Sequence, residues 1–329
     1  MMRLAATFVS LLRPAVDPAE LHSIPCITLF YAMRVVARFI PLLALSIGLS
    51  ASTVHAASGW LNWRGPDQNG VSKASVKLPD KLEIGGPNHR WSYKVKGAGT
   101  PVMADGRVYA FGFYGETTDV EETLICLDVK TGKKLWEHRF RDYLSDTTYN
   151  RYSIGAPVID AETGNVYLES TWGHLFAWNR DGKLLWERSM VEEFGRLTFP
   201  NGRTGALVID GPIVITDGIT ANWGGDGPAR NRFYGFDKYT GELIWASTPG
   251  IEPIDSTFAT PVFGNLGDQR VFYQGTGCGN IVCVNARTGE AVWRFRLSQA
   301  GVNADVILAG NGKLIGIHGN TGVPAPFTL

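Results

Sequence analysis

The sequence predicts an all-β fold, a β-propeller of four-stranded antiparallel blades, of which the chain supplies about four and a half. One observation is composition: the 329 residues include 39 glycines and 10 tryptophans, which is typical of many short strands joined by tight turns. The other is internal repetition. Four similar segments recur at intervals of roughly 50 residues, the length of one four-stranded blade.

Each repeat consists of an alternating apolar strand, a turn containing Thr-Gly or Asp-Gly, and a strand that ends on tryptophan. The turn glycine supplies the positive-φ residue that a tight hairpin needs. The tryptophan recurs at one place in every repeat, so we expect it to pack between neighbouring blades. The turn glycines are Gly132, Gly182, Gly241 and Gly289, and the predicted structural tryptophans are Trp91, Trp136, Trp186, Trp245 and Trp293.

A second hairpin precedes each of these segments, so every blade is predicted to be two consecutive hairpins. Pro101, Pro157 and Pro261 open three of the first strands, where a missing N–H does little harm. We expect a lone outer strand at residues 89–95, ahead of the first blade. The blades are expected at about 99–140, 155–190, 205–248 and 259–297, with a partial blade at 304–319.

An aspartate or asparagine also recurs at one position of each blade, just before the turn. These side chains hydrogen-bond to nearby backbone N–H groups in turns, so we expect them to cap the turn and not to take part in catalysis. The four residues are Asp128, Asn179, Asp237 and Asn285.

The first part of the chain has the pattern of a secretory signal peptide at residues 33–56. Arg34 and Arg38 form a basic start, residues 39–49 an apolar run, and Ala56 ends a small-residue cleavage pattern. We therefore expect an exported protein, periplasmic or extracellular, with no transmembrane span after cleavage. Residues 1–32 are expected to be a non-native or unstructured extension, residues 57–88 a lead-in segment, and residues 320–329 a tail.

Charge and cysteine content restrict the class of partner. Lysine plus arginine equals aspartate plus glutamate at 31 each, which gives no net charge to attract nucleic acid. The mature chain keeps three cysteines, Cys126, Cys278 and Cys283. The last two could pair across a hairpin in an oxidising compartment, or both could be buried strand thiols.

The recurring strand–turn–tryptophan pattern resembles the pyrroloquinoline-quinone-like β-propeller repeat family. The four matching segments are 124–137, 175–187, 233–246 and 281–294, and the resemblance covers about residues 59–319. Residues 60–72 resemble the opening of exported planctomycete-type members. Members of the family usually close eight blades, so three alternatives stay open: a truncated reading frame, early closure with residues 89–95 as the missing outer strand, or two copies that complete one ring.

Loops that lead into the first strand of each blade, together with one long loop, form the predicted ligand site. Arginine forks bind carboxylates well, so a small polar or anionic ligand held by Arg151 and Arg203 is one hypothesis. The alternative is that these arginines pair with Asp146 or Asp255 and only hold the loops. The candidate residues are Arg151, Arg203, Asp255, Ser256, Asn303, Trp223 and Arg230.

The sequence shows no catalytic residues and no metal site that we can complete from its own motifs. We therefore expect a binding or scaffold module for a protein, a polysaccharide or a small polar ligand, with no cofactor. The family resemblance implies an alternative: a fragment of a quinoprotein alcohol or sugar dehydrogenase that uses pyrroloquinoline quinone with calcium. Such enzymes typically place a disulfide of adjacent cysteines over the quinone, and this sequence has no adjacent pair.

Overall fold

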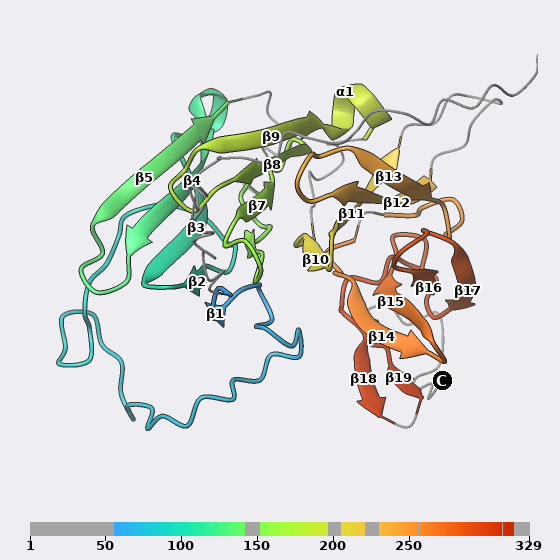
Figure 1. Cartoon of the computed structure of the whole chain (residues 1–329), viewed down its shortest axis with the longest axis horizontal. Helices are drawn as coiled ribbons and strands as arrows, with labels where there is room; N and C mark the ends of the chain where they lie inside the picture. The colour runs from blue at the N-terminus through green and yellow to red at the C-terminus, as the bar shows by residue number, and fades with distance from the viewer. Residues whose placement is uncertain are drawn as a thin grey trace, which may run out of the picture. The chain divides into compact units, whose positions relative to one another are not determined.

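The computed structural model describes residues 56–141, 152–196, 205–220, 230–255, 257–310 and 312–318. This part of the chain is nearly all β, in five antiparallel sheets that follow one another along the sequence (Figure 1). The predicted extension at 1–32, all of the predicted signal peptide except Ala56, and the tail at 320–329 lie outside the described residues. Among the described residues, no helix is both long enough and apolar enough to cross a membrane.

Four sheets are four-stranded blades, one of them with an added strand, and the fifth sheet is half a blade. The prediction of about four and a half blades of antiparallel strands is confirmed. The elements are β1 (Gly59–Trp60); blade 1, β2 (Val102–Ala104), β3 (Arg107–Tyr114), β4 (Glu121–Asp128) and β5 (Lys134–Phe140); blade 2, β6 (Val158–Ile159), β7 (Val166–Glu169), β8 (His174–Trp178) and β9 (Leu184–Ser189); blade 3, β10 (Val208–Asp210), β11 (Ile213–Thr220), β12 (Arg230–Asp237) and β13 (Leu243–Ser247); blade 4, β14 (Val262–Leu266), β15 (Gln269–Gly275), β16 (Asn280–Asn285) and β17 (Ala291–Arg296); and the half blade, β18 (Ile307–Gly310) and β19 (Lys313–Ile315).

Two short helices interrupt the strands. A 3₁₀ turn, η1 (Thr117–Asp119), joins β3 to β4. Helix α1 (Met190–Phe194) follows β9; it begins at Ser189, whose side chain accepts a hydrogen bond from the Glu192 N–H, and ends at Gly195 in the left-handed conformation. A capping serine at the start and a glycine at the end are the usual boundary residues of a helix. Both helices only connect strands, and the fold is built from the blades.

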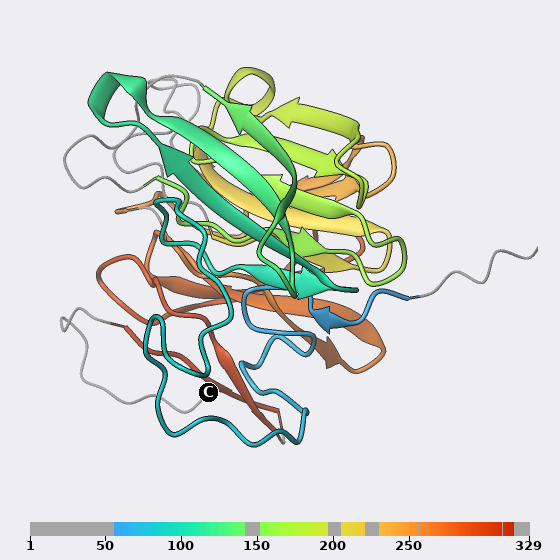
Figure 2. The same cartoon turned by 90° about the vertical axis from the view of Figure 1, so that its left-hand side faces the viewer.

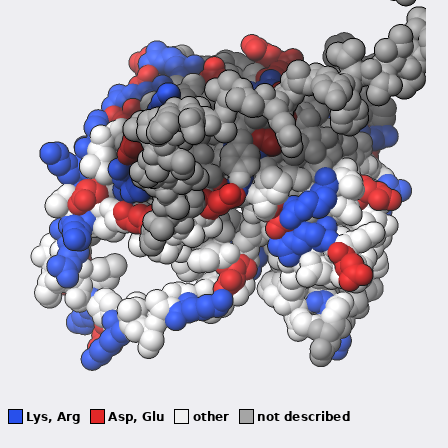
Figure 3. All heavy atoms as spheres, viewed as in Figure 1, with Lys and Arg blue, Asp and Glu red and all other residues white. Residues whose placement is uncertain are grey.

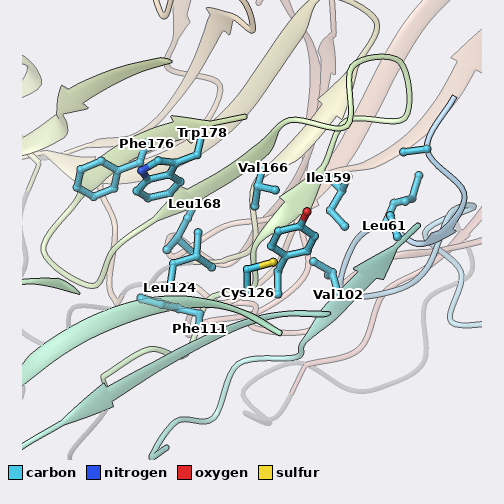
Figure 4. Close-up of a cluster of buried hydrophobic side chains, with 13 residues drawn as sticks. Leu61, Val102, Phe111, Leu124, Cys126, Ile159, Val166, Leu168, Phe176 and Trp178 are labelled. Carbon is cyan, nitrogen blue, oxygen red and sulfur yellow. The ribbon is translucent and has the colours of Figure 1, made fainter. Parts of the chain in front are cut away.

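Apolar side chains from consecutive blades interlock to form the core. Figure 4 shows one such interface, where Leu124 and Phe111 of blade 1 face Leu168 and Phe176 of blade 2. Similar clusters join blade 2 to blade 3, blade 3 to blade 4, and blade 4 to the half blade. Each interior blade is therefore buried on both faces, which explains why its middle strands are almost continuously hydrophobic.

Four of the five repeated tryptophans pack against the turn glycine of the next blade along the chain. A Cβ atom added at Gly182 would lie 2.8 Å from the Trp136 ring, and one at Gly241 would lie 2.7 Å from the Trp186 ring. The Trp136 indole also donates to the Arg180 carbonyl at 3.0 Å. Only glycine leaves room for the ring and also tolerates the positive φ of these turns. The Gly132–Trp91 and Gly289–Trp245 pairs repeat this arrangement.

The capping role predicted for the residue before each turn is confirmed. The Asp128 carboxylate accepts from the backbone N–H groups of Lys130 and Thr131 at 3.1 and 2.8 Å. Asn179, Asp237 and Asn285 accept backbone hydrogen bonds in the same way. The side chain thus mimics a turn hydrogen bond and fixes the start of the outer strand.

The outer strand expected ahead of blade 1 needs correction, and of the two alternatives for Cys278 and Cys283, that of buried thiols is the one found. Residues 89–95 form no strand, and the bridge to Phe113 of blade 1 is made by Lys96, just after them. Within the stretch, Trp91 packs on Gly132 and its indole donates to the Val129 carbonyl at 2.9 Å. Cys278 and Cys283 are free, buried thiols. Cys278 lies in the turn before β16, whereas Cys283 lies inside β16, so about 13 Å of extended strand separates Cys283 from the turn, too far for a disulfide.

Candidate binding site at one end of the blades

A segment ahead of the first blade lies across the first strands of several blades; residues 57–70 are called the plug segment. Strand β1 pairs with β2 of blade 1, and the Leu61 carbonyl then accepts from the Ile159 N–H of blade 2 at 2.8 Å. Beyond it, the Trp63 indole donates to the Thr260 hydroxyl at 3.0 Å. In both views the blue plug segment lies between the green sheets and the orange ones (Figures 1 and 2).

Contacts within the plug segment itself stabilise its turn. Asn62 accepts from the Arg64 N–H at 3.0 Å, and the Gly70 N–H closes the turn on the Arg64 carbonyl at 2.9 Å. Gly65 has a φ of +80°, and a Cβ there would lie 2.9 Å from the Trp60 ring. A larger residue would be both strained and excluded, so the glycine lets the turn fold back over Trp60.

A cavity of about 340 Å³ lies where the first strands begin, and Trp63 forms part of its wall. The backbones of neighbouring blades approach closely there: a Cβ at Gly99 would lie 2.2 Å from the Gly155 carbonyl oxygen. Small residues are therefore required at this end of the blades. The lining residues of this mouth cavity are Trp63, Ala98, Thr100, Ile154, Gly155, Ala156, Gly205, Ala206, Phe258 and Asn303.

The mouth cavity contains only part of the predicted ligand site. Asn303 lines it and accepts from the Phe258 N–H at 3.2 Å. Asp255 lies beside the turn of blade 4 instead, where its N–H donates to the Gly277 carbonyl at 3.1 Å. Arg230 begins β12 and pairs with Thr220 across the sheet. The other candidates, Arg151, Arg203, Trp223 and Ser256, lie outside the described residues.

A buried carboxylate links blade 1 to blade 2. Glu122 accepts hydrogen bonds from the backbone N–H groups of Ser153 and Thr171 at 2.7 and 3.0 Å, and also from both hydroxyls. Burial raises the pKa of this carboxyl, and the four donors oppose the rise. These contacts hold the chain that leads into blade 2 against blade 1.

A second carboxylate links blade 2 to blade 3. Glu169 forms an ion pair with Arg196 at 3.1 Å and accepts from the Thr216 hydroxyl, and both charged side chains are almost fully buried. Burial raises the pKa of Glu169, while the Arg196 charge opposes the rise. Gly173 and Gly218 leave room for the guanidinium, since a Cβ at either would lie 2.8–3.1 Å from the Arg196 side chain.

A third carboxylate links blade 3 to blade 4. Asp217 accepts from the amide groups of Asn231 and Gln274 at 2.8 and 2.9 Å. Burial raises its pKa to about 6, although the two amides and the nearby Arg196 work against the shift. The same kind of contact therefore recurs at three successive interfaces, and we interpret these carboxylates as ties between blades.

The sequence reasoning missed Trp63, Phe258 and the three inter-blade carboxylates as members of this region. Trp63 stands in the segment that the sequence predicts to be a lead-in and that resembles the opening of exported family members. A clue was available, because two tryptophans so close together in a glycine- and asparagine-rich stretch indicate a packed turn. Nothing in the local pattern distinguishes Glu122 or Glu169 from surface acids, since their partners come from other blades.

The described lining of the mouth cavity does not fit calcium beside a quinone. Calcium in proteins takes six to eight oxygen ligands, several of them carboxylates. No carboxylate lines the mouth cavity, whose polar side chains are Thr100, Asn303 and the Trp63 indole. Among the described residues, no three His, Cys, Asp or Glu side chains gather closely enough to hold a metal.

The fold and the blade contacts define a β-propeller of pyrroloquinoline-quinone-like repeats. Residues 86–219 and 229–324 match the family model described as outer membrane protein assembly factor BamB, and the chain belongs to this family.

Curated relatives include quinoprotein dehydrogenases. The quinone-dependent alcohol dehydrogenase subunit of Komagataeibacter europaeus is 31% identical over 256 residues, covering 60% of this chain and 32% of the relative. The quinoprotein ethanol dehydrogenase of Pseudomonas aeruginosa is 28% identical over 229 residues, covering 64% and 34%. The chain thus spans about a third of the length of these relatives. Among solved structures, a europium-containing methanol dehydrogenase has the same fold, with a TM-score of 0.50 and 14% identity over 69% of this chain and 49% of that one.

Proposed function

We propose that this chain is an extracytoplasmic binding and scaffold module that holds a protein partner at the mouth cavity. The observation that carries the proposal is Trp63, which is 36% exposed in an apolar cavity of about 340 Å³ and has Phe258 among its fellow lining residues. An aromatic wall with few polar groups accepts an apolar anchor side chain, the usual centre of a protein–protein contact. Asn303 adds a polar group at the same cavity.

The rigidity of the surrounding blades supports this use of the cavity. Its walls come from backbone that is tied between blades, for example by Glu122 and by the Thr260–Asp305 hydrogen bonds of 2.7 and 3.0 Å. A site that is formed in advance loses less conformational entropy on binding. The mouth cavity can therefore bind a partner without a large rearrangement of its own walls.

The test is selection of displayed peptides on the immobilised full chain, followed by affinity measurements on variants. We expect Trp63→Ala to weaken binding by about tenfold or more, as for a central aromatic contact. Trp63→Phe should weaken it less, because the ring is kept and only the hydrogen bond to Thr260 is lost. Trp293→Ala, a partly exposed tryptophan that does not line this cavity, is the matched control. Selected peptides that bind Trp63→Ala as tightly as the wild type would overturn the proposal.

A second candidate function is supported by those curated relatives that are quinone-dependent alcohol dehydrogenases. Under this alternative the chain is a fragment of such an enzyme. Saturable, calcium-dependent binding of pyrroloquinoline quinone, with dye-linked oxidation of ethanol, would favour it over the binding module. Loss of that quinone binding in Arg151→Ala plus Arg203→Ala would assign the two arginines to the site.

Export is part of the proposal and has its own test. The signal pattern at residues 33–56 predicts that the secreted protein begins at Ala57. N-terminal sequencing of protein recovered outside the cytoplasm should give Ala-Ser-Gly-Trp. Recovery of an uncleaved chain in the cytoplasm would contradict it.

A further inference from the structure

The outer strand of every complete blade carries a β-bulge at the same place. The strand register shifts between Cys126 and Leu127 in blade 1, and between Ala177 and Trp178 in blade 2. It shifts again between Gly235 and Phe236, and between Cys283 and Val284. A bulge leaves one residue of the outer strand without a partner and turns its side chain away from the regular alternation. In each blade this extra residue comes immediately before the repeated tryptophan.

The bulge exposes large apolar side chains on the rim of the propeller. Leu135 of blade 1 is 46% exposed, and Leu184 and Leu185 of blade 2 are 43% and 42% exposed. The two blades touch here, because Trp136, next to Leu135, packs on Gly182 in the turn before Leu184. The three leucines are called the leucine rim, an apolar patch that the interior of the fold does not require.

Exposed basic side chains surround the leucine rim. Lys130, Lys133, Arg180 and Lys183 are exposed and form no ion pair with another described residue. Of the nearby carboxylates, Asp128 caps its own turn and Asp181 pairs with Arg107 at 2.9 Å, while Glu187 of β9 is an exposed acid on the same strand as Leu185. Figure 3 shows Lys and Arg atoms, with Asp and Glu atoms among them, along the edge of the molecule on which β5 lies in Figure 1.

The same position in blade 3 has the apolar residues, but the cation that reaches its turn is neutralised: Arg188 donates to the Gly241 carbonyl at 2.8 Å and is paired with Glu193. Leu243 and Ile244 are 41% and 47% exposed. Their turn carries the exposed Glu242, and its only lysine, Lys238, is buried in ion pairs with Asp160 and Glu162. Blade 3 therefore serves as an internal control. It has the same bulge and similarly exposed apolar side chains, but its turn carries an exposed acidic residue.

We propose that the leucine rim and its basic border dock on an anionic lipid surface. Apolar side chains that insert at the headgroup boundary, flanked by lysine and arginine, are the usual chemistry of peripheral membrane binding. Each basic residue near an anionic bilayer contributes about 1 kcal/mol, and the contribution is screened by salt. The docking would leave the mouth cavity, built from a different set of residues, available for its partner.

Vesicle flotation of the full chain tests the inference. Vesicles of phosphatidylcholine with phosphatidylglycerol should bind the protein, binding should fall with added salt, and pure phosphatidylcholine vesicles should bind little. Lys130→Gln/Lys133→Gln/Arg180→Gln/Lys183→Gln should lower the partition coefficient by up to about a thousandfold at low salt, from four contributions of about 1 kcal/mol each. Leu135→Ser/Leu184→Ser/Leu185→Ser should lower it by about tenfold. Leu243→Ser/Ile244→Ser should bind like the wild type.

Several results would overturn the inference. One is equal binding of the wild type and the leucine-rim variant to anionic vesicles. Another is an equal loss in the blade 3 variant, which would indicate a general effect of removing apolar surface. A third is no binding to anionic vesicles together with tight binding to polyglutamate, which would identify an acidic polypeptide as the occupant instead. Unchanged circular dichroism and melting temperature would verify that each variant is folded.

Discussion

Asp217 contributes to the stability of the folded state in a pH-dependent way. Its pKa is about 6 in the folded protein and about 4 in an unfolded chain. As pH rises, the unfolded chain loses this proton first, so the stabilising contribution is complete below about pH 4 and lost by about pH 6. The group therefore favours folding under acidic conditions, opposite to a salt-bridged aspartate.

We predict that Asp217→Asn removes this pH dependence. The amide keeps the shape and the contact with Asn231 but cannot ionise. Between pH 4 and 7 the free energy of unfolding of the wild type should fall by about 2 kcal/mol relative to the variant. Urea unfolding at four pH values measures the difference. A difference between the two proteins that stays constant with pH would contradict the prediction.

Gly241 is required both for its backbone conformation and for the space it leaves. Its φ is +72°, and an added Cβ would lie 2.7 Å from the Trp186 ring. Gly164 offers a matched comparison, since its φ is +70° but its surroundings are open. We predict that Gly164→Ala costs about 1 kcal/mol from backbone strain alone, and Gly241→Ala about 3 kcal/mol or more. Denaturant titration measures both, and equal costs would show that the tryptophan contact adds nothing.

Among the elements, the outer strand and its tryptophan join one blade to the next. Trp186 is 8% exposed, and its indole donates to the Lys238 carbonyl at 3.0 Å in the following blade. Trp293 stands at the same place in blade 4 and remains half-buried. No third-to-fourth-strand turn of a next blade lies among the described residues. The tryptophan at one position of the repeat therefore packs differently in two blades.

We predict that Trp186→Ala lowers the free energy of unfolding by about 4 kcal/mol, as expected for removing a buried aromatic side chain. Trp293→Ala should cost about 1 kcal/mol, within the range of partly exposed sites. Thermal and urea unfolding provide the measurement. Similar costs for the two variants would mean that packing on the next turn glycine does not stabilise the blade interface.

Across the whole molecule, the plug segment ties the beginning of the described chain to its end. The Arg64 side chain donates to Asp305 of the half blade at 3.2 Å, and both side chains are largely buried. Burial raises the pKa of Asp305, and Arg64 opposes the rise. One ion pair thus links residues 241 positions apart in the sequence.

We predict that Arg64→Ala loosens the half blade. Asp305 would remain buried without its cation, and such a group costs more than the pair contributes. Amide hydrogen exchange in residues 304–310 should become about tenfold faster, which corresponds to 1.4 kcal/mol. Lys73→Ala, which removes an exposed pair with Asp67, serves as the control and should change nothing. Unchanged exchange in Arg64→Ala would show that the half blade is held by other contacts.

The sequence by itself determined the blade, because the blade is a local object. Turn glycines, capping residues such as Asp128 and strand alternation act within a few dozen residues, so composition and spacing reveal them. The tertiary structure decided what the blades enclose. Trp63 meets Thr260 from 197 residues away, Glu122 finds its donors in the next blade, and a bulge decides that Leu185 faces outward. Each of these depends on packing between blades, and a pattern along one strand carries no information about the surface that will lie opposite it.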